Sequence, residues 1–136
     1  MGFILSIERE LLDHFTQFKK EPRALTNQNS ENPNDRYLVQ YFRTGKLTFA
    51  ELLYTIKDSK GSGGVLMKEF YTWARKTLPD LQEYLSGIDL RPLISLRQKC
   101  THGHPSFEPQ TIKDIEPHLP ALREILYRLC MPYNKT

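Results

Sequence analysis

The stretch L93-I-S-L-R-Q-K-C-T-H-G-H-P-S106 joins an apolar helical segment to a dense polar end. It opens as an apolar helical segment with Leu93, Ile94 and Leu96, and Arg97 follows directly. Helices seldom reach the residue before a proline, and glycine takes the left-handed conformation that ends many helices. Gly103 and Pro105 therefore predict that the helix ends near the first histidine, with both imidazoles at or just beyond its last turn.

The helix that carries this stretch is predicted to begin a few residues upstream. Asp89 suits an N-cap position, because its carboxylate accepts hydrogen bonds from the first backbone N–H groups of a helix. Pro92 fits the first turn, where a missing N–H costs little. We therefore expect a helix from about Leu90 to the first histidine.

Helical periodicity recurs over the rest of the chain. Apolar residues repeat every three or four positions in residues 3–18, 49–56, 65–78, 81–88, 111–115 and 119–129. Thr48 and Glu51 have the spacing of a capping box. Residues 35–43 favour a short helix, with a strand as the alternative. Because the sequence contains no convincing strand pair and no repeat, we predict an all-α fold: a single-domain antiparallel bundle of five to six helices over residues 1–136.

Two segments lack periodicity and are predicted to be flexible connections, residues 23–34 and residues 57–64. The first is rich in Asn, Ser and Pro, and the second reads K-D-S-K-G-S-G-G. A basic, glycine-rich loop can cradle a phosphate, but that motif requires a lysine and a hydroxyl residue directly after its last glycine. Neither follows here, so a linker is the favoured interpretation.

The composition is that of an ordinary soluble domain of 136 residues. A formal net charge of +3 permits an RNA or phosphate partner, and a solvated surface accounts for it equally well. Cys100 and Cys130 belong to no C-x-x-C pair, so we expect free thiols, with Cys130 packed as a small hydrophobe. The apolar run at residues 3–5 is too short for a signal peptide or membrane span, which predicts a cytoplasmic chain with no membrane contact.

Arg97 and His102 form an Arg-x-x-x-x-His pattern at the end of a predicted helix in an all-α chain. This resembles the HEPN superfamily, whose members are small helical bundles with such a motif, often written R-N-x-x-x-H, near the end of a late helix. The pattern here reads R97-Q-K-C-T-H102. Gln98 stands where the family commonly has Asn, and it offers the same amide groups. The resemblance covers the motif and the helical layout of most of the chain.

The resemblance implies a metal-independent endoribonuclease without a cofactor. It also implies a homodimer in which the two motifs face each other across the interface. Proteins of this kind serve as microbial toxins or antiviral defence effectors, so an antitoxin or effector-complex partner is implied as well. The chemistry is consistent with the motif: RNA carries its own nucleophile, the 2'-hydroxyl, and needs a proton carrier near neutral pH and a cation at the phosphate.

Arg97 and His102 are the catalytic residues that the resemblance implies. An imidazole exchanges protons near pH 7, and a guanidinium offers a planar fork to phosphate oxygens. Positions five apart on a helix are rotated by roughly 140°. Unwinding at Gly103, or a second copy of the motif, would therefore be needed to complete the site. The candidate substrate-binding residues are Gln98, Lys99, Thr101 and His104.

A purely structural interpretation of this stretch is a helix C-terminus at which Arg97, Lys99 and His102 complement the helix dipole by about 1 kcal/mol. Two imidazoles beside a glycine and a proline exceed what such an end needs, which favours a functional site. A metal site is not expected, because His102 and His104 have no cysteine or carboxylate at familiar ligand spacing. The sequence is also compatible with a non-catalytic helical dimerisation or interaction module and with a domain of a larger effector.

Overall fold

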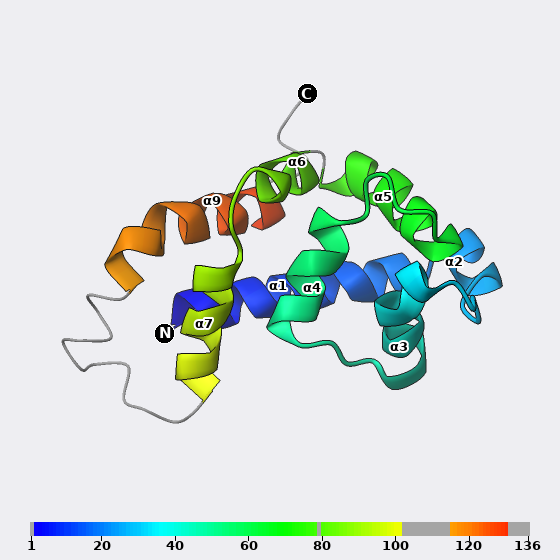
Figure 1. The fold of residues 1–136 in the computed structure, drawn as a ribbon, viewed down its shortest axis with the longest axis horizontal. Coiled ribbons are helices and arrows are strands. Elements are labelled where there is room, and N and C mark those ends of the chain that lie inside the picture. The colour runs from blue at the N-terminus through cyan, green and yellow to red at the C-terminus, as the bar shows by residue number, and fades with distance from the viewer. Residues whose placement is uncertain (1, 79, 102–114, 131–136) are drawn as a thin grey trace.

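The computed structural model describes residues 2–78, 80–101 and 115–130 of the chain, and within them it contains helices and no β-strand (Figure 1). The α-helices are α1 (Gly2–Lys19), α2 (Pro22–Thr26), α3 (Arg36–Thr44), α4 (Phe49–Lys57), α5 (Val65–Thr77), α6 (Leu81–Ser86), α7 (Arg91–Thr101) and α9 (Leu119–Cys130), with 3-10 turns η1 (Pro33–Asp35) and η2 (Glu116–His118). The predicted all-α class is confirmed. The described residues hold more helices than the five to six expected, because helices as short as α2 carry little periodicity.

Helix α1 runs along the length of the molecule, and α4 and α7 cross it (Figure 1). Helices α9, α6 and α5 follow one another along the other side. In the same view α1 and α9 run in the same direction, so this pair does not follow the antiparallel arrangement expected of neighbours. Antiparallel packing is imposed by short connections, and α1 and α9 stand at opposite ends of the described chain.

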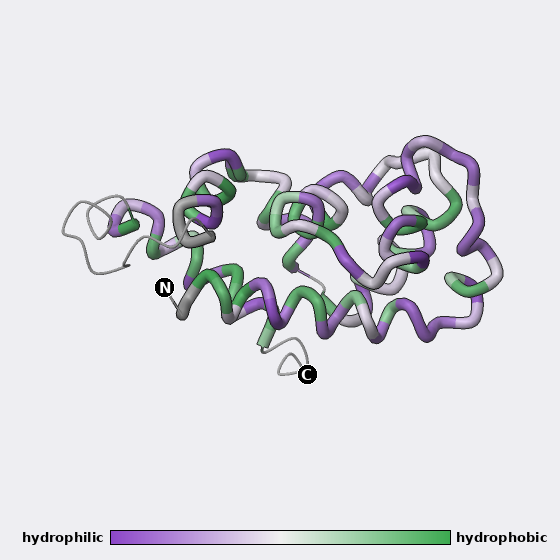
Figure 2. Tube along the Cα trace, turned by 90° about the horizontal axis from the view of Figure 1, so that it is seen from below, coloured by the Kyte–Doolittle hydropathy of each residue, from purple (hydrophilic) through white to green (hydrophobic). Residues whose placement is uncertain are grey.

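Helix α1 supplies much of the core because its apolar residues recur at helical spacing. Apolar and polar stretches alternate along it in Figure 2, as expected for an amphipathic helix. Its fully buried side chains are Ile4, Ile7, Leu11, Phe15 and Phe18. The predicted helix over residues 3–18, ending before Pro22, is confirmed.

An aromatic cluster joins the second half of α1 to α5. The ring centroid of Phe18 lies 5.0 Å from that of Phe70 and 5.6 Å from that of Trp73. The rings of Phe15 and Phe70 are 4.9 Å apart. Trp73 is half-buried at the edge of this cluster and packs against the core, as expected for a residue on the apolar face of α5.

Helices α3 and α4 begin and end as their sequences indicate. Residues 36–44 form a helix rather than a strand, and Gly45 ends it with φ 71°, a left-handed conformation that glycine adopts without strain. Thr48 and Glu51 form the predicted capping box, in which the Glu51 N–H donates to the Thr48 hydroxyl at 3.1 Å.

The segment at residues 23–34 is more ordered in structure than its composition indicates. Helix α2 occupies its start and η1 its end. The carboxylate of Asp35 is fully buried there and accepts hydrogen bonds from the Ser30 hydroxyl at 2.6 Å and the Met67 backbone N–H at 2.9 Å. A carboxylate from one loop thus satisfies a free N–H in the first turn of α5, which fixes the position of residues 30–36.

Candidate functional site

Helix α7 places the Arg97 side chain at the border between the core and the surface. Leu93 and Leu96 are 2% and 3% exposed and hold the helix against the core. Arg97 follows on the edge of this buried face, with a side chain that is 21% exposed, and Gln98 is exposed. The last described residue of the helix is Thr101, one turn beyond Arg97.

The guanidinium of Arg97 is held by Glu8 of α1. Arg97 Nη2 donates to Glu8 Oε1 at 2.9 Å, and Arg97 Nε donates to Oε2 at 3.3 Å. Both side chains are about four-fifths buried, which weakens the competition from water. A two-point ion pair of this kind fixes the plane of the guanidinium as well as its position.

Of the residues predicted to form the site, the structure describes the side chains of Arg97 and Gln98. His102 and His104 lie outside the described residues. Lys99 and Thr101 belong to α7, and their side chains lie outside the described part of the chain. The role of these four residues therefore stays a prediction.

Glu8 is a contact of Arg97 that the sequence does not indicate. The two residues are separated by 89 positions. Glu8 is one of several charged residues on the polar side of α1, and no local pattern distinguishes it from Arg9 or Glu10. Only the crossing of α7 over the first turns of α1 brings its carboxylate to Arg97 (Figure 1).

The glycine-rich segment after α4 does not have the geometry of a phosphate cradle. In such a cradle, the N–H groups at the start of the following helix point at the phosphate. Here the Met67 N–H in the first turn of α5 is already taken by the Asp35 carboxylate. A Cβ atom on Gly64 would overlap that carboxylate, so glycine at this position makes room for Asp35. This packing agrees with the sequence-based interpretation that the segment is not a phosphate-binding loop.

His14 has a structural role at the end of α9. Its Nε2–H donates to the backbone carbonyl of Leu129 at 3.0 Å. That carbonyl is one of the last four of α9, which have no partner within the helix. His14 Nδ1 is buried with no hydrogen-bond partner among the described residues.

Cys130 is a free thiol, as predicted, but it is exposed rather than packed as a small hydrophobe. It follows Leu129, which fills the core position at the end of α9. Partial burial of the sulfur, with a smaller contribution from the Glu10 carboxylate, raises the pKa of the thiol above its ordinary value.

No group of three or more His, Cys, Asp or Glu residues in the described part of the chain could hold a metal ion. Over the same residues, no helix is both long enough and apolar enough to cross a membrane. Comparison of the chain with protein-family models, with curated proteins and with solved structures found no significant match.

Proposed function

We propose that this chain is a metal-independent endoribonuclease whose cleavage site lies where α7 ends. The observation that carries the proposal is the placement of Arg97. Its guanidinium is partly exposed, is fixed by Glu8, and lies on α7 five positions before His102 in the sequence. A cation that is already oriented needs little reorganisation when charge develops on a bound phosphate.

In the proposed reaction the 2'-hydroxyl of the RNA attacks the adjacent phosphorus. One imidazole accepts the proton of that hydroxyl, and the 5'-oxygen of the next nucleotide leaves with a proton from a second imidazole. Arg97 binds the non-bridging phosphate oxygens. The products are a 2',3'-cyclic phosphate and a 5'-hydroxyl. In this proposal, both imidazoles are His102 side chains, one from each of two copies of the chain.

A second copy of the chain would complete this site. Arg97 and His102 are rotated by roughly 140° on a continuous helix, so one helix end points them in different directions. Opposed ends of two α7 helices would supply both imidazoles.

The test is cleavage of a fluorescent single-stranded RNA with a chelator present. We expect His102→Ala and Arg97→Ala to lower the rate by at least about 100-fold. The matched controls are His118→Ala and Arg123→Ala, which remove the same side-chain types from α9 and its preceding turn. Mass spectrometry of the products should find cyclic phosphate ends. Full activity in either site variant would refute the proposal.

A second candidate is a non-catalytic helical interaction module. The Arg97–Glu8 pair favours it, because a structural ion pair between two helices also explains why an arginine stands at this position. This candidate predicts a protein that cleaves no RNA and forms a dimer, measured by light scattering, that dissociates when Arg97→Ala loosens the contact of α7 with α1 beside the interface. A larger effector complex would be a suitable partner for either candidate, whereas an antitoxin would be a partner of the nuclease.

A further inference from the structure

Two neighbouring hollows share one wall formed by Pro33 and Arg36. The larger, about 600 Å³, lies between this wall, α4 and the glycine-rich segment. The smaller, about 380 Å³, lies on the other side of it along α3. Both volumes are within the roughly 300–1,000 Å³ typical of small-molecule sites, and together they continue across the face of α3.

Hydrogen bonds of Asp35 and Asn32 hold the wall between the hollows in place. The buried Asp35 carboxylate ties it to α5 through the Met67 N–H. The Asn32 side chain accepts from the Asn34 N–H at 2.9 Å and donates to the Gly63 carbonyl at 3.4 Å, which links the wall to the far side of the larger hollow. The hollows are therefore part of the folded structure and do not depend on a ligand to form them.

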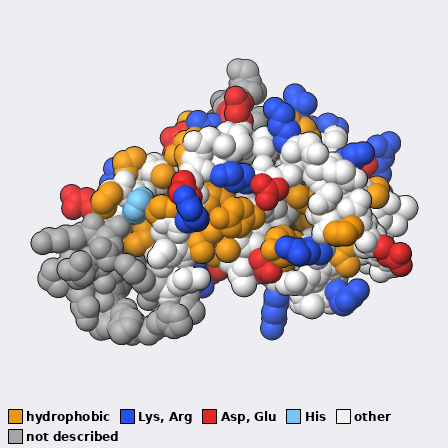
Figure 3. All heavy atoms as spheres, viewed as in Figure 1, with side chains coloured by type: hydrophobic (Ala, Val, Ile, Leu, Met, Phe, Trp, Pro, Cys, Tyr) orange, Lys and Arg blue, Asp and Glu red, His pale blue; other side chains and the backbone are white. Residues whose placement is uncertain are grey.

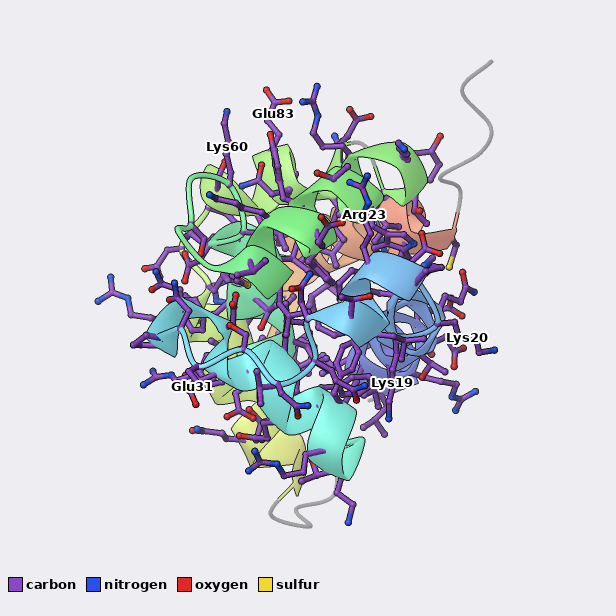
Figure 4. The ribbon with its side chains drawn as sticks, turned by 90° about the vertical axis from the view of Figure 1, so that its right-hand side faces the viewer. Lys19, Lys20, Arg23, Glu31, Lys60 and Glu83 are labelled. Carbon is purple, nitrogen blue, oxygen red and sulfur yellow. The ribbon has the colours of Figure 1, made fainter. Side chains whose placement is uncertain are left out.

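Cations outnumber carboxylates along the two hollows. Arg36 and Lys60 line the larger and Arg43 lines the smaller, against Asp58 and Glu31. Lys57 also lines the larger hollow, but its ammonium is engaged by the Ile88 carbonyl, to which it donates at 2.6 Å. On the face seen in Figure 3, basic side chains stand around the part formed by α3, α4 and α5. Figure 4 shows Lys60 and Glu31 on one side of the molecule and Lys20 on the opposite side.

Two half-buried tyrosines, Tyr37 and Tyr54, stand among these cations in the larger hollow. The guanidinium of Arg36 lies 4.9 Å from the Tyr37 ring and donates to its hydroxyl at 3.3 Å. This contact places a guanidinium beside an aromatic ring. Guanidinium groups and aromatic rings both stack against unpaired bases, while neighbouring cations bind the backbone phosphates.

We infer that the α3–α4 groove, defined by these two hollows, binds a single strand of RNA away from the α7 end. This rests on the proposed function, which makes RNA the substrate. Two hollows on either side of one shared arginine suit successive nucleotides of a polymer better than one small molecule. A duplex would keep its bases stacked and could not place them in the hollows.

The test measures binding of a 2'-O-methyl RNA of about 12 nucleotides, a length within the site sizes of single-strand binders. Such an RNA lacks the nucleophile and cannot be cleaved by the proposed reaction, so binding is measured separately from catalysis. The variant is Arg36→Glu/Lys60→Glu, and the matched control is Lys20→Glu/Lys76→Glu, which makes the same charge change at exposed positions outside both hollows. Circular dichroism checks that both variants fold.

We expect the groove variant to bind the strand about tenfold more weakly or worse, and to lower the salt slope of binding by about 0.7 for each phosphate that the protein no longer neutralises. The control should bind as the wild type does. A groove variant with unchanged affinity, or a control weakened equally, would overturn the inference. Binding of a mononucleotide as tightly as the strand would overturn it in favour of a small ligand, and equal binding of the duplex would exclude single-strand selectivity.

These outcomes separate the groove from the nuclease. If the wild type cleaves RNA and the groove variant binds normally, the groove inference fails and the proposed function stands. If the wild type cleaves no RNA and the groove variant still loses affinity for the strand, the proposed function fails and the groove is an RNA-binding surface of a non-catalytic protein.

Discussion

Arg97 and Glu8 form a two-point ion pair that connects the end of α7 to the first turns of α1, with Nη2 2.9 Å from Oε1 and Nε 3.3 Å from Oε2. The pair is four-fifths buried, so it both holds the two helices together and orients the guanidinium. Its two roles can be measured separately.

Glu8→Gln should release the guanidinium from its fixed plane. We expect kcat for RNA cleavage to fall roughly 10–100-fold, because a small misplacement of a catalytic group is costly. Loss of a part-buried, charged hydrogen-bond partner should also lower the free energy of unfolding by about 1–3 kcal/mol. Glu83→Gln is the matched control, since it removes the same charge from an exposed position. A lower stability with unchanged kcat would make the pair purely structural.

Gly64→Ala should destabilise the protein by about 1–3 kcal/mol, because the new Cβ would overlap the Asp35 carboxylate. Gly63→Ala is the control: its nearest neighbour, the Asn34 amide, would be at an ordinary contact distance of 3.7 Å. In an Asp35→Ala background the Gly64→Ala change should cost much less. Thermal unfolding of the four proteins in this double-mutant cycle measures the coupling, and additive effects would show that the two sites do not interact.

His14→Ala should lower the free energy of unfolding by about 2–3 kcal/mol, because it leaves the Leu129 carbonyl without its partner and opens a cavity between α1 and α9. His118, half-buried in η2, is the control, and His118→Ala should change stability by no more than about 0.5 kcal/mol. Urea unfolding measures both. Equal effects of the two substitutions would contradict a specific role for His14.

Asp89 should stay ionised to a lower pH than an ordinary aspartate, down to about pH 2. Hydrogen bonds from the Arg91 side chain and backbone N–H lower the pKa of Asp89 from 3.8 to about 2. The unfolded chain therefore binds this proton first as the pH falls. The contribution of the ionised carboxylate is complete above about pH 4 and is lost as the pH falls through about 2. Carboxyl carbon NMR shifts measure this directly, and a midpoint near 3.8 would contradict it.

The sequence by itself determined the all-α class and the main helices. The apolar spacing of α1, the capping box of α4 and the proline-marked start of α7 are local features, and each acts over one or two turns. Residues 89–92 illustrate the limit of such reasoning: Asp89 does accept the Arg91 N–H at 3.0 Å, yet the helix begins at Arg91, one residue later than expected.

Only the tertiary structure decided which distant residues meet. The pairing of Glu8 with Arg97, of Asp35 with the first turn of α5, and of His14 with the end of α9 joins positions 89, 32 and 115 residues apart. No local pattern encodes such contacts, because they depend on the crossing of whole helices around a shared core. Packing of helices also forms the α3–α4 groove, whose cations and tyrosines come from two segments, residues 36–43 and 54–60, that meet only when α3, α4 and the glycine-rich segment pack together.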